Sequence, residues 1–143
     1  MSYLNVDKVQ LSIDECRDIK ENNIKQTNRN FILLNKTIIL EIEMEPILDN
    51  FPKKRSLLSN SIEKVLYEMI EALNFFQVNN KSDKIKMKYL KEYVAKLSMF
   101  DLYINISHRR RIINHDKFVK IGKKIAELRR IAWGLAAGIE KND

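Results

Sequence analysis

Apolar residues between positions 90 and 104 alternate at steps of three and four, and this spacing constrains the fold more than any other feature of the chain. The series consists of Leu90, Tyr93, Leu97, Phe100 and Ile104. Steps of three and four place side chains on one face of an α-helix, whereas a strand requires steps of two. The pattern therefore predicts an amphipathic helix whose apolar seam must be covered by other helices.

Two further segments carry the same helical period. From position 59 or 61 to 77, the apolar residues are Ile62, Val65, Leu66, Met69, Ile70, Leu73 and Phe76. After position 114, they are Phe118, Ile121, Ile125, Leu128, Ala132 and Leu135. The polar residues 78–83 form a predicted turn that ends in Ser82 or Asp83 as a helix cap, and Asn114 can cap the last helix.

Residues 31–50 predict one more helix. Its apolar side chains are Leu34, Ile38, Ile39, Ile42 and Leu48. Pro46 should kink or finish its last turn, and Phe51 and Pro52 follow its end. Four amphipathic helices with short polar connections favour antiparallel neighbours, so residues 31–143 predict an all-α, up-down-up-down four-helix bundle.

Residues 1–30 read as a polar N-terminal extension outside the bundle. Ser12 and Glu15 have the spacing of a capping box, which predicts a short helix over about residues 13–22. The single cysteine, Cys16, can form neither an internal disulfide nor a CxxC pair. Because the chain shows neither a signal-like start nor 18 consecutive apolar residues, we expect a soluble cytoplasmic protein without a membrane partner.

Charge divides the chain into an acidic front and a basic body. Residues 1–50 contain nine acidic and six basic residues, whereas the remaining 93 contain 20 basic and 10 acidic ones. This excess favours a polyanionic partner. The alternative is a solvated surface whose charge only keeps the protein soluble.

Side chains with catalytic or metal-binding chemistry do not form a familiar site. The two histidines, His108 and His115, are seven residues apart, which is not a ligand spacing. Three acidic residues follow one another at steps of two, a spacing that points their side chains in different directions around a helix: Glu41, Glu43 and Glu45. The three glycines lie inside one helical pattern and therefore do not form a phosphate-binding loop: Gly122, Gly134 and Gly138. We therefore expect a protein that is not an enzyme and that uses no metal or cofactor.

Basic residues are either gathered in connections or spaced along helix faces. In an up-down-up-down bundle the first and third connections share one end, which brings together Lys53, Lys54, Arg55, Arg109, Arg110 and Arg111. Those on the third helix are Lys81, Lys84, Lys88 and Lys91, and those on the fourth are Lys117, Lys120, Lys123, Lys124 and Arg130. Such surfaces predict contacts to the phosphates of RNA or DNA, which give affinity without reading sequence.

A second apolar strip is predicted on the outer side of the fourth helix. Its members are Gly122, Ala126, Arg129, Trp133 and Ala137. Small residues let another helix come close, and Trp133 is the type of side chain that anchors interfaces. The strip predicts a homo-oligomer; alternatively, Trp133 covers an edge of the bundle or receives the N-terminal extension.

The order of these elements resembles the accessory variability determinant family of diversity-generating retroelements and related proteins encoded in 23S rRNA intervening sequences. In that family a helix ends near a proline, a Phe-Pro-basic element leads into a second helix, and the last helix carries Glu-Ile-Gly-Arg. The counterparts here are Pro46, Phe51, Pro52, Lys53, Lys54 and Arg55, followed by Glu127, Leu128, Arg129 and Arg130. Arg129 replaces the glycine of the family pattern. The resemblance covers about residues 35–139.

The resemblance implies a non-enzymatic bundle that forms a pentamer, binds RNA or DNA, and works beside a reverse transcriptase. Two alternatives remain open at this point. One is a protein-binding helical scaffold or an intervening-sequence-type bundle without a reverse transcriptase partner. The other is a toxin, antitoxin or phage regulator built on a helical bundle.

Overall fold

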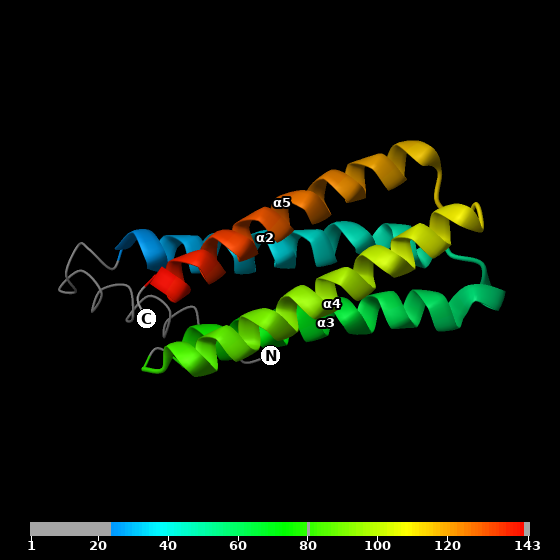
Figure 1. The fold of residues 1–143 in the computed structure, drawn as a ribbon. Helices are drawn as coiled ribbons and strands as arrows, with labels where there is room; N and C mark the ends of the chain where they lie inside the picture. Colours follow the sequence, from blue (N-terminus) through cyan, green and yellow to red (C-terminus); the bar gives the residue numbers. More distant parts are fainter. Residues whose placement is uncertain (1–23, 80, 142–143) are drawn as a thin grey trace.

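The computed structural model describes residues 24–79 and 81–141, and in this part the chain forms four long α-helices and one short 3₁₀ turn. In chain order they are α2 (Ile24–Asp49), η3 (Lys53–Arg55), α3 (Ser56–Val78), α4 (Asp83–Arg109) and α5 (His115–Lys141). Each helix packs on its two neighbours around a square. Figure 1 shows the α2–α3 and α4–α5 connections at one end and the α3–α4 turn at the other. The predicted up-down-up-down bundle is confirmed.

The seam that predicted the third helix lies at the centre of the bundle. All five of its residues, from Leu90 to Ile104, are at most 1% exposed. The Ser82 side-chain oxygen accepts a hydrogen bond from the Ile85 amide at 3.3 Å and caps α4. The helix therefore begins where its cap predicts and buries the face that its spacing predicts.

The apolar stripe of α5 is buried as predicted, apart from its first member. Phe118 is half-buried, whereas Ile121, Ile125 and Leu128 are each at most 4% exposed. The Asn114 side-chain oxygen accepts a hydrogen bond from the Lys117 amide at 2.8 Å. Asn114 is therefore the predicted cap of α5.

Helix α3 begins earlier than the predicted position 59 or 61. The amide of Arg55 donates to the Pro52 carbonyl at 2.8 Å, and the resulting turn η3 leads directly into α3 at Ser56. At the other end, the Asn79 amide group donates to the Phe75 carbonyl at 2.7 Å. This bond satisfies one of the carbonyls that a helix leaves free at its C-terminus.

Helix α2 differs most from its prediction. It begins at Ile24, seven residues before position 31, whereas it ends at Asp49, within a turn of Pro46 and next to the predicted end at position 50. The predicted short helix over 13–22 lies outside the described residues. Ile39 and Ile42 are 52% and 56% exposed. Of the other predicted side chains, Leu48 is buried and Leu34 and Ile38 are half-buried. The buried face of α2 consists of Leu33, Thr37, Leu40, Met44 and Leu48.

A buried hydrogen bond joins α2 and α4 across the core. The Thr37 hydroxyl donates to the Leu33 carbonyl at 2.7 Å, and the Tyr93 hydroxyl lies 2.8 Å from the Thr37 oxygen. Since threonine has one hydroxyl hydrogen, Tyr93 donates to Thr37. Burial raises the pKa of the Tyr93 hydroxyl far above its usual range, because a phenolate loses its hydration here. The pair lets a polar group lie in the core without an unsatisfied donor.

No helix in the described part combines the length and the apolar character that crossing a bilayer requires.

Candidate nucleic-acid interface

Two runs of basic residues lie at the end of the bundle that holds the α2–α3 and α4–α5 connections (Figure 1). We call them the basic pole, which consists of Lys53, Lys54, Arg55, Arg109, Arg110 and Arg111. Five of the six are exposed and Arg55 is half-buried. Because each run belongs to a different connection, the fold brings together cations that are far apart in the sequence.

Within the described part of the chain, ion pairs do not neutralise the positive charge of the basic pole. In residues 24–79 and 81–141, none of the ion pairs involves a member of the pole. The nearest acids along the chain are Asp49, which ends α2, and Asp116, in the first turn of α5. A carboxylate in a first turn complements the helix dipole, so Asp116 already has a favourable local role. The pole therefore presents concentrated positive potential to solvent.

Arg111 occupies a backbone position that normally carries glycine. Its φ is +59°, its amide donates to the His108 carbonyl at 2.9 Å, and the Ile112 amide donates to the Ser107 carbonyl at 2.9 Å. These two bonds form a Schellman motif, which places its C′ residue in the left-handed region. A side chain in this region costs about 1–2 kcal/mol. The chain thus accepts strain at a position that keeps a cation in the basic pole.

We expect Arg111→Gly to stabilise the protein. Relief of the left-handed strain exceeds the extra backbone entropy that glycine loses on folding, which leaves a gain of about 0.5–1 kcal/mol. Thermal unfolding should show a midpoint raised by about 2–4 °C. Arg110→Gly is the matched control, because it removes the same charge at φ −83° and should lower the midpoint. An unchanged or lower midpoint for Arg111→Gly contradicts the strain argument.

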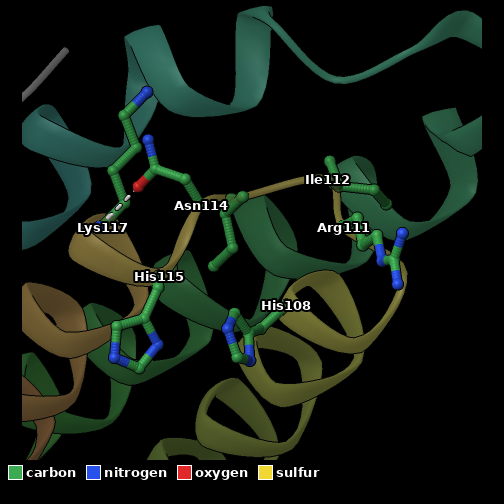
Figure 2. A pocket seen from close by; sticks show the side chains of 7 residues that line it. His108, Arg111, Ile112, Asn114, His115 and Lys117 are labelled. Atoms are coloured by element: carbon green, nitrogen blue, oxygen red, sulfur yellow. Dashed lines mark hydrogen bonds between the residues drawn. The ribbon is translucent and has the colours of Figure 1, made fainter.

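A pocket of about 420 Å³ lies beside the same turn. Its lining residues are His108, Arg111, Ile112, Ile113, Asn114, His115 and Lys117. Figure 2 shows the two imidazole rings near each other, with Arg111 and Lys117 on opposite sides of Asn114. None of the lining residues is acidic, so the pocket offers imidazole, guanidinium and ammonium groups suited to an anion such as a phosphate.

The two histidines are held by aromatic packing. The His108 ring stacks on Phe118 with centroids 4.0 Å apart and planes 8° from parallel, and the His115 centroid lies 5.6 Å from that of His108. Within the described ranges, no group of three or more His, Cys, Asp or Glu side chains could hold a metal ion. Stacking against Phe118 accounts for the position of the His108 ring.

The lysines predicted on the third helix form a second basic region. Lys84, Lys88 and Lys91 are exposed on α4, whereas Lys81 is exposed in the turn before the helix begins. They lie toward the α3–α4 end, opposite the basic pole (Figure 1). The structure therefore does not bring the two sets together.

The basic residues of α5 differ in whether their side chains are free to contact a phosphate. Lys117, Lys120, Lys123 and Arg130 are exposed. Lys117 and Lys120 lie in the first turns of α5 and so extend the basic pole, because α5 begins at that end. Lys124 is half-buried and forms an ion pair with Glu43 of α2. Of the predicted phosphate-binding residues on α5, Lys124 is thus already occupied by an internal partner.

Ion pairs connect each helix to a neighbour along the bundle. Lys36 of α2 lies 2.7 Å from Glu127 of α5, and this hydrogen-bonded ammonium lowers the pKa of the Glu127 carboxyl. Lys96 and Glu68 join α4 to α3 at 3.1 Å. Partly exposed pairs of this kind each contribute little to stability, about 0–1 kcal/mol. They show which side of each helix faces its neighbour.

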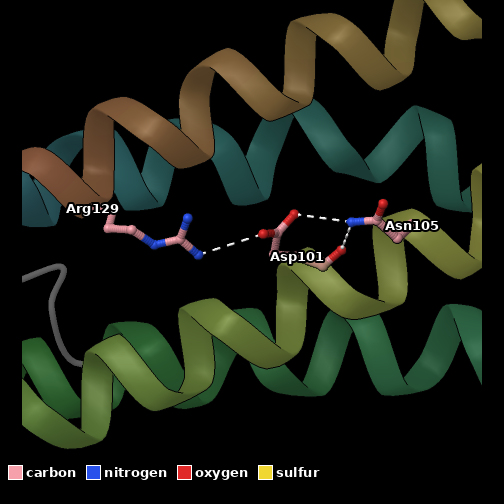
Figure 3. Close-up of polar contacts among 3 residues, drawn as sticks. All are labelled: Asp101, Asn105 and Arg129. Atoms are coloured by element: carbon pink, nitrogen blue, oxygen red, sulfur yellow. Dashed lines mark hydrogen bonds and ion pairs between the residues drawn. The ribbon is translucent and has the colours of Figure 1, made fainter.

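Arg129, which was predicted to lie in the oligomer strip, points toward α4. Its guanidinium lies 3.4 Å from an Asp101 carboxylate oxygen, and Asp101 also accepts from Asn105 at 3.2 Å (Figure 3). The remaining members of the strip are exposed: Gly122, Ala126, Trp133 and Ala137. Trp133 is 58% exposed, so the described helices do not cover it. The structure thus separates Arg129, an interhelical side chain, from an open apolar strip.

Sequence reasoning missed Lys86, which is 8% exposed. Its ammonium nitrogen lies 5.2 Å from the centroid of the Phe76 ring, and its aliphatic part is buried at the α3–α4 interface. The regular spacing of Lys84, Lys88 and Lys91 identifies the outer face, and Lys86 falls off that spacing. This offset is the signal in the sequence by which Lys86 could have been identified.

The described residues combine exposed cationic surfaces, an anion-compatible pocket and an open apolar strip on a helical bundle. The three glycines lie inside α5, where a Cβ atom would meet no atom within 4 Å, so they are not needed for a turn or a close approach.

Comparisons with models of protein families, with curated proteins and with solved structures find no match to this chain.

Proposed function

We propose that this chain is a non-enzymatic, basic, oligomeric accessory protein that binds RNA or DNA in the cytoplasm. The basic pole supports this proposal most strongly, because six cations lie at one end of the bundle without an ion pair in the described part of the chain. The family resemblance adds a reverse transcriptase of a diversity-generating retroelement as a partner.

The binding mechanism is neutralisation of phosphates. Lysine and arginine side chains of the basic pole contact backbone phosphates and release condensed counterions. Arginines add planar, forked donors that match a phosphate group, and the pocket beside Arg111 offers further donors at the same end. Contacts to phosphates carry no sequence information, so this part of the binding should depend on charge rather than on sequence.

Replacing the six residues of the basic pole with glutamine should weaken RNA binding at least tenfold at about 0.1 M salt. Each lost phosphate contact flattens the slope of log affinity against log salt by about 0.7 for a single strand. Fluorescence anisotropy across a salt series measures both quantities. The matched control replaces Lys64 and Lys141, which are exposed and lie outside the proposed sites. An unchanged affinity and slope in the pole variant would show that the pole serves only solubility.

A second candidate function is a protein-binding scaffold, or an intervening-sequence-type bundle without a reverse transcriptase. Apolar side chains on the outside of α2 favour it: Ile32, Ile39 and Ile42 are 43%, 52% and 56% exposed. Steps of seven and three place them on one line along the helix, where another helix could pack. The salt series separates the two functions, since a pure scaffold shows no salt-dependent retention on RNA.

Self-association belongs to the same proposal. The open strip on α5 contains an exposed tryptophan among small residues, and a ring is the expected closed form if the contact between copies is heterologous. The family resemblance favours five subunits. A ring would repeat the basic pole in each copy, so a polyanion could contact several poles at once and bind with higher avidity.

A further inference from the structure

An aromatic pair joins the partly exposed sides of α3 and α4 near their turn. The rings of Phe75 and Tyr89 have centroids 5.2 Å apart and planes inclined by 30°. Phe75 is 39% exposed and Tyr89 is half-buried. The interior of the same interface is already filled by Phe76 and Leu90, each 1% exposed. Tyr89 packs against this core, so closure of the core explains its position but not that of the exposed Phe75 ring beside it.

Aliphatic and basic side chains surround this pair. Val78 is 65% exposed and Ile85 is 41% exposed. The ammonium nitrogen of Lys88 lies 5.3 Å from the centroid of the Tyr89 ring. We call this surface the aromatic–lysine patch, which consists of Phe75, Val78, Ile85, Lys88 and Tyr89.

Charge distinguishes the patch from an ordinary apolar contact surface. Lys81 and Lys84, in the turn and in the first turn of α4, are exposed next to it. Among the described residues, no ion pair occupies Lys81, Lys84 or Lys88. Asp83, half-buried in the first turn of α4, lies between Lys81 and Lys84 in the sequence, and the exposed acids Glu71 and Glu92 each lie one helical turn beyond the patch.

We infer that the aromatic–lysine patch binds single-stranded nucleic acid by stacking unpaired bases on Phe75 and Tyr89 while Lys81, Lys84 and Lys88 contact the phosphates. Aromatic rings interleaved with cations are the arrangement that holds single strands without sequence preference. A duplex keeps its bases stacked and paired inside, so it presents no free base face to the rings. The inference rests on the proposed function and names the form of nucleic acid that this end of the bundle selects.

The patch and the basic pole lie at opposite ends of the bundle (Figure 1). On α4, Tyr89 of the patch and Arg109 of the pole are 20 residues apart, so the two surfaces are separated by roughly 30 Å along the helix. Because they do not overlap, substitutions in one leave the other intact. Stacking at the patch can therefore be tested without removing any charge.

The test compares the wild type with the double variant Phe75→Leu, Tyr89→Leu. The probes are a fluorescent 12-nucleotide oligo(U), a duplex of equal length, and an abasic 12-mer with the same number of phosphates. The double variant should bind oligo(U) at least tenfold more weakly, because the loss of even one stacked base has about that effect, with duplex affinity unchanged. The wild type should bind the abasic strand as weakly as the double variant binds oligo(U). Phe75→Trp should keep wild-type affinity.

Tyr67→Leu is the matched control, since Tyr67 is a 53% exposed aromatic on α3 whose hydroxyl faces Glu41 rather than a lysine. It should leave all affinities unchanged. Equal oligo(U) binding by the wild type and the double variant overturns the inference but leaves the proposed function standing. A parallel loss for oligo(U) and duplex also overturns it, because stacking would not be the cause. If the wild type binds none of the three probes, the proposed function fails as well. Should the double variant not fold, the abasic comparison on the wild type decides.

Discussion

Replacement of Leu97 by aspartate is expected to unfold the bundle. Leu97 is completely buried in the middle of the α4 seam. The change removes a leucine from the core, at about 2–5 kcal/mol, and places a carboxylate there without a partner, at several kcal/mol more. The total stability of a domain is about 5–15 kcal/mol, so these costs consume most or all of it. Far-UV circular dichroism should show loss of helix at 25 °C or a strongly lowered thermal midpoint.

Ser98→Asp is the matched control for this result. Ser98 follows Leu97 on the same helix but is exposed, so its substitution introduces the same carboxylate into water. It should change the midpoint by only a degree or two, because an exposed substitution has an effect within about 0.5 kcal/mol. Leu66→Asp, at another completely buried position, should reproduce the loss of helix. Wild-type melting of both core variants would contradict the bundle core described above.

Replacement of Trp133 by glutamate is expected to convert an oligomer to a monomer while leaving the helices formed. The side chain is 58% exposed, so its loss opens no cavity in the core of the protomer. In an interface, however, truncation of a buried tryptophan costs about 2 kcal/mol or more, and the new charges of all copies would be desolvated together. Multi-angle light scattering at micromolar concentration should show the mass fall to about 17 kDa.

Gly134→Glu provides the control for the assembly experiment. Gly134 is the next residue on α5, and a Cβ atom there meets no atom within 4 Å. It lies about 100° around the helix from Trp133, outside the strip, and adds the same charge. The Gly134→Glu variant should keep the wild-type mass. A wild type that is already monomeric, or a Trp133→Glu variant with the full assembly mass, shows that this strip is not the interface.

The elements that local spacing determines can be read from the sequence. The seam from Leu90 to Ile104 and the caps Ser82 and Asn114 each depend on residues within a few helical turns, and the structure confirms them. Short connections between such helices determine the topology, which places the two basic runs at one end. The sequence therefore predicted the existence of the basic pole.

The face that α2 buries could not be read in the same way. Isoleucines and leucines occur on several sides of this helix, so its apolar residues do not define one stripe. The buried line instead includes Thr37, a polar residue that becomes acceptable only because Tyr93, 56 positions later, donates a hydrogen bond to it. Burial of Leu40 rather than Ile39 follows from the position of the neighbouring helices.

The sequence by itself determined four helices, their order, most of their ends and the presence of an excess of basic residues. Tertiary structure alone decided which of those basic residues can contact an external partner. It pairs Lys124 with Glu43 and Arg129 with Asp101, and it buries Lys86. It also places Phe75 beside Tyr89. The reason is physical. Helical period depends on residues three and four apart, whereas ion pairs and aromatic contacts between helices depend on the rotation and offset of whole helices, which are set when all the faces pack at once.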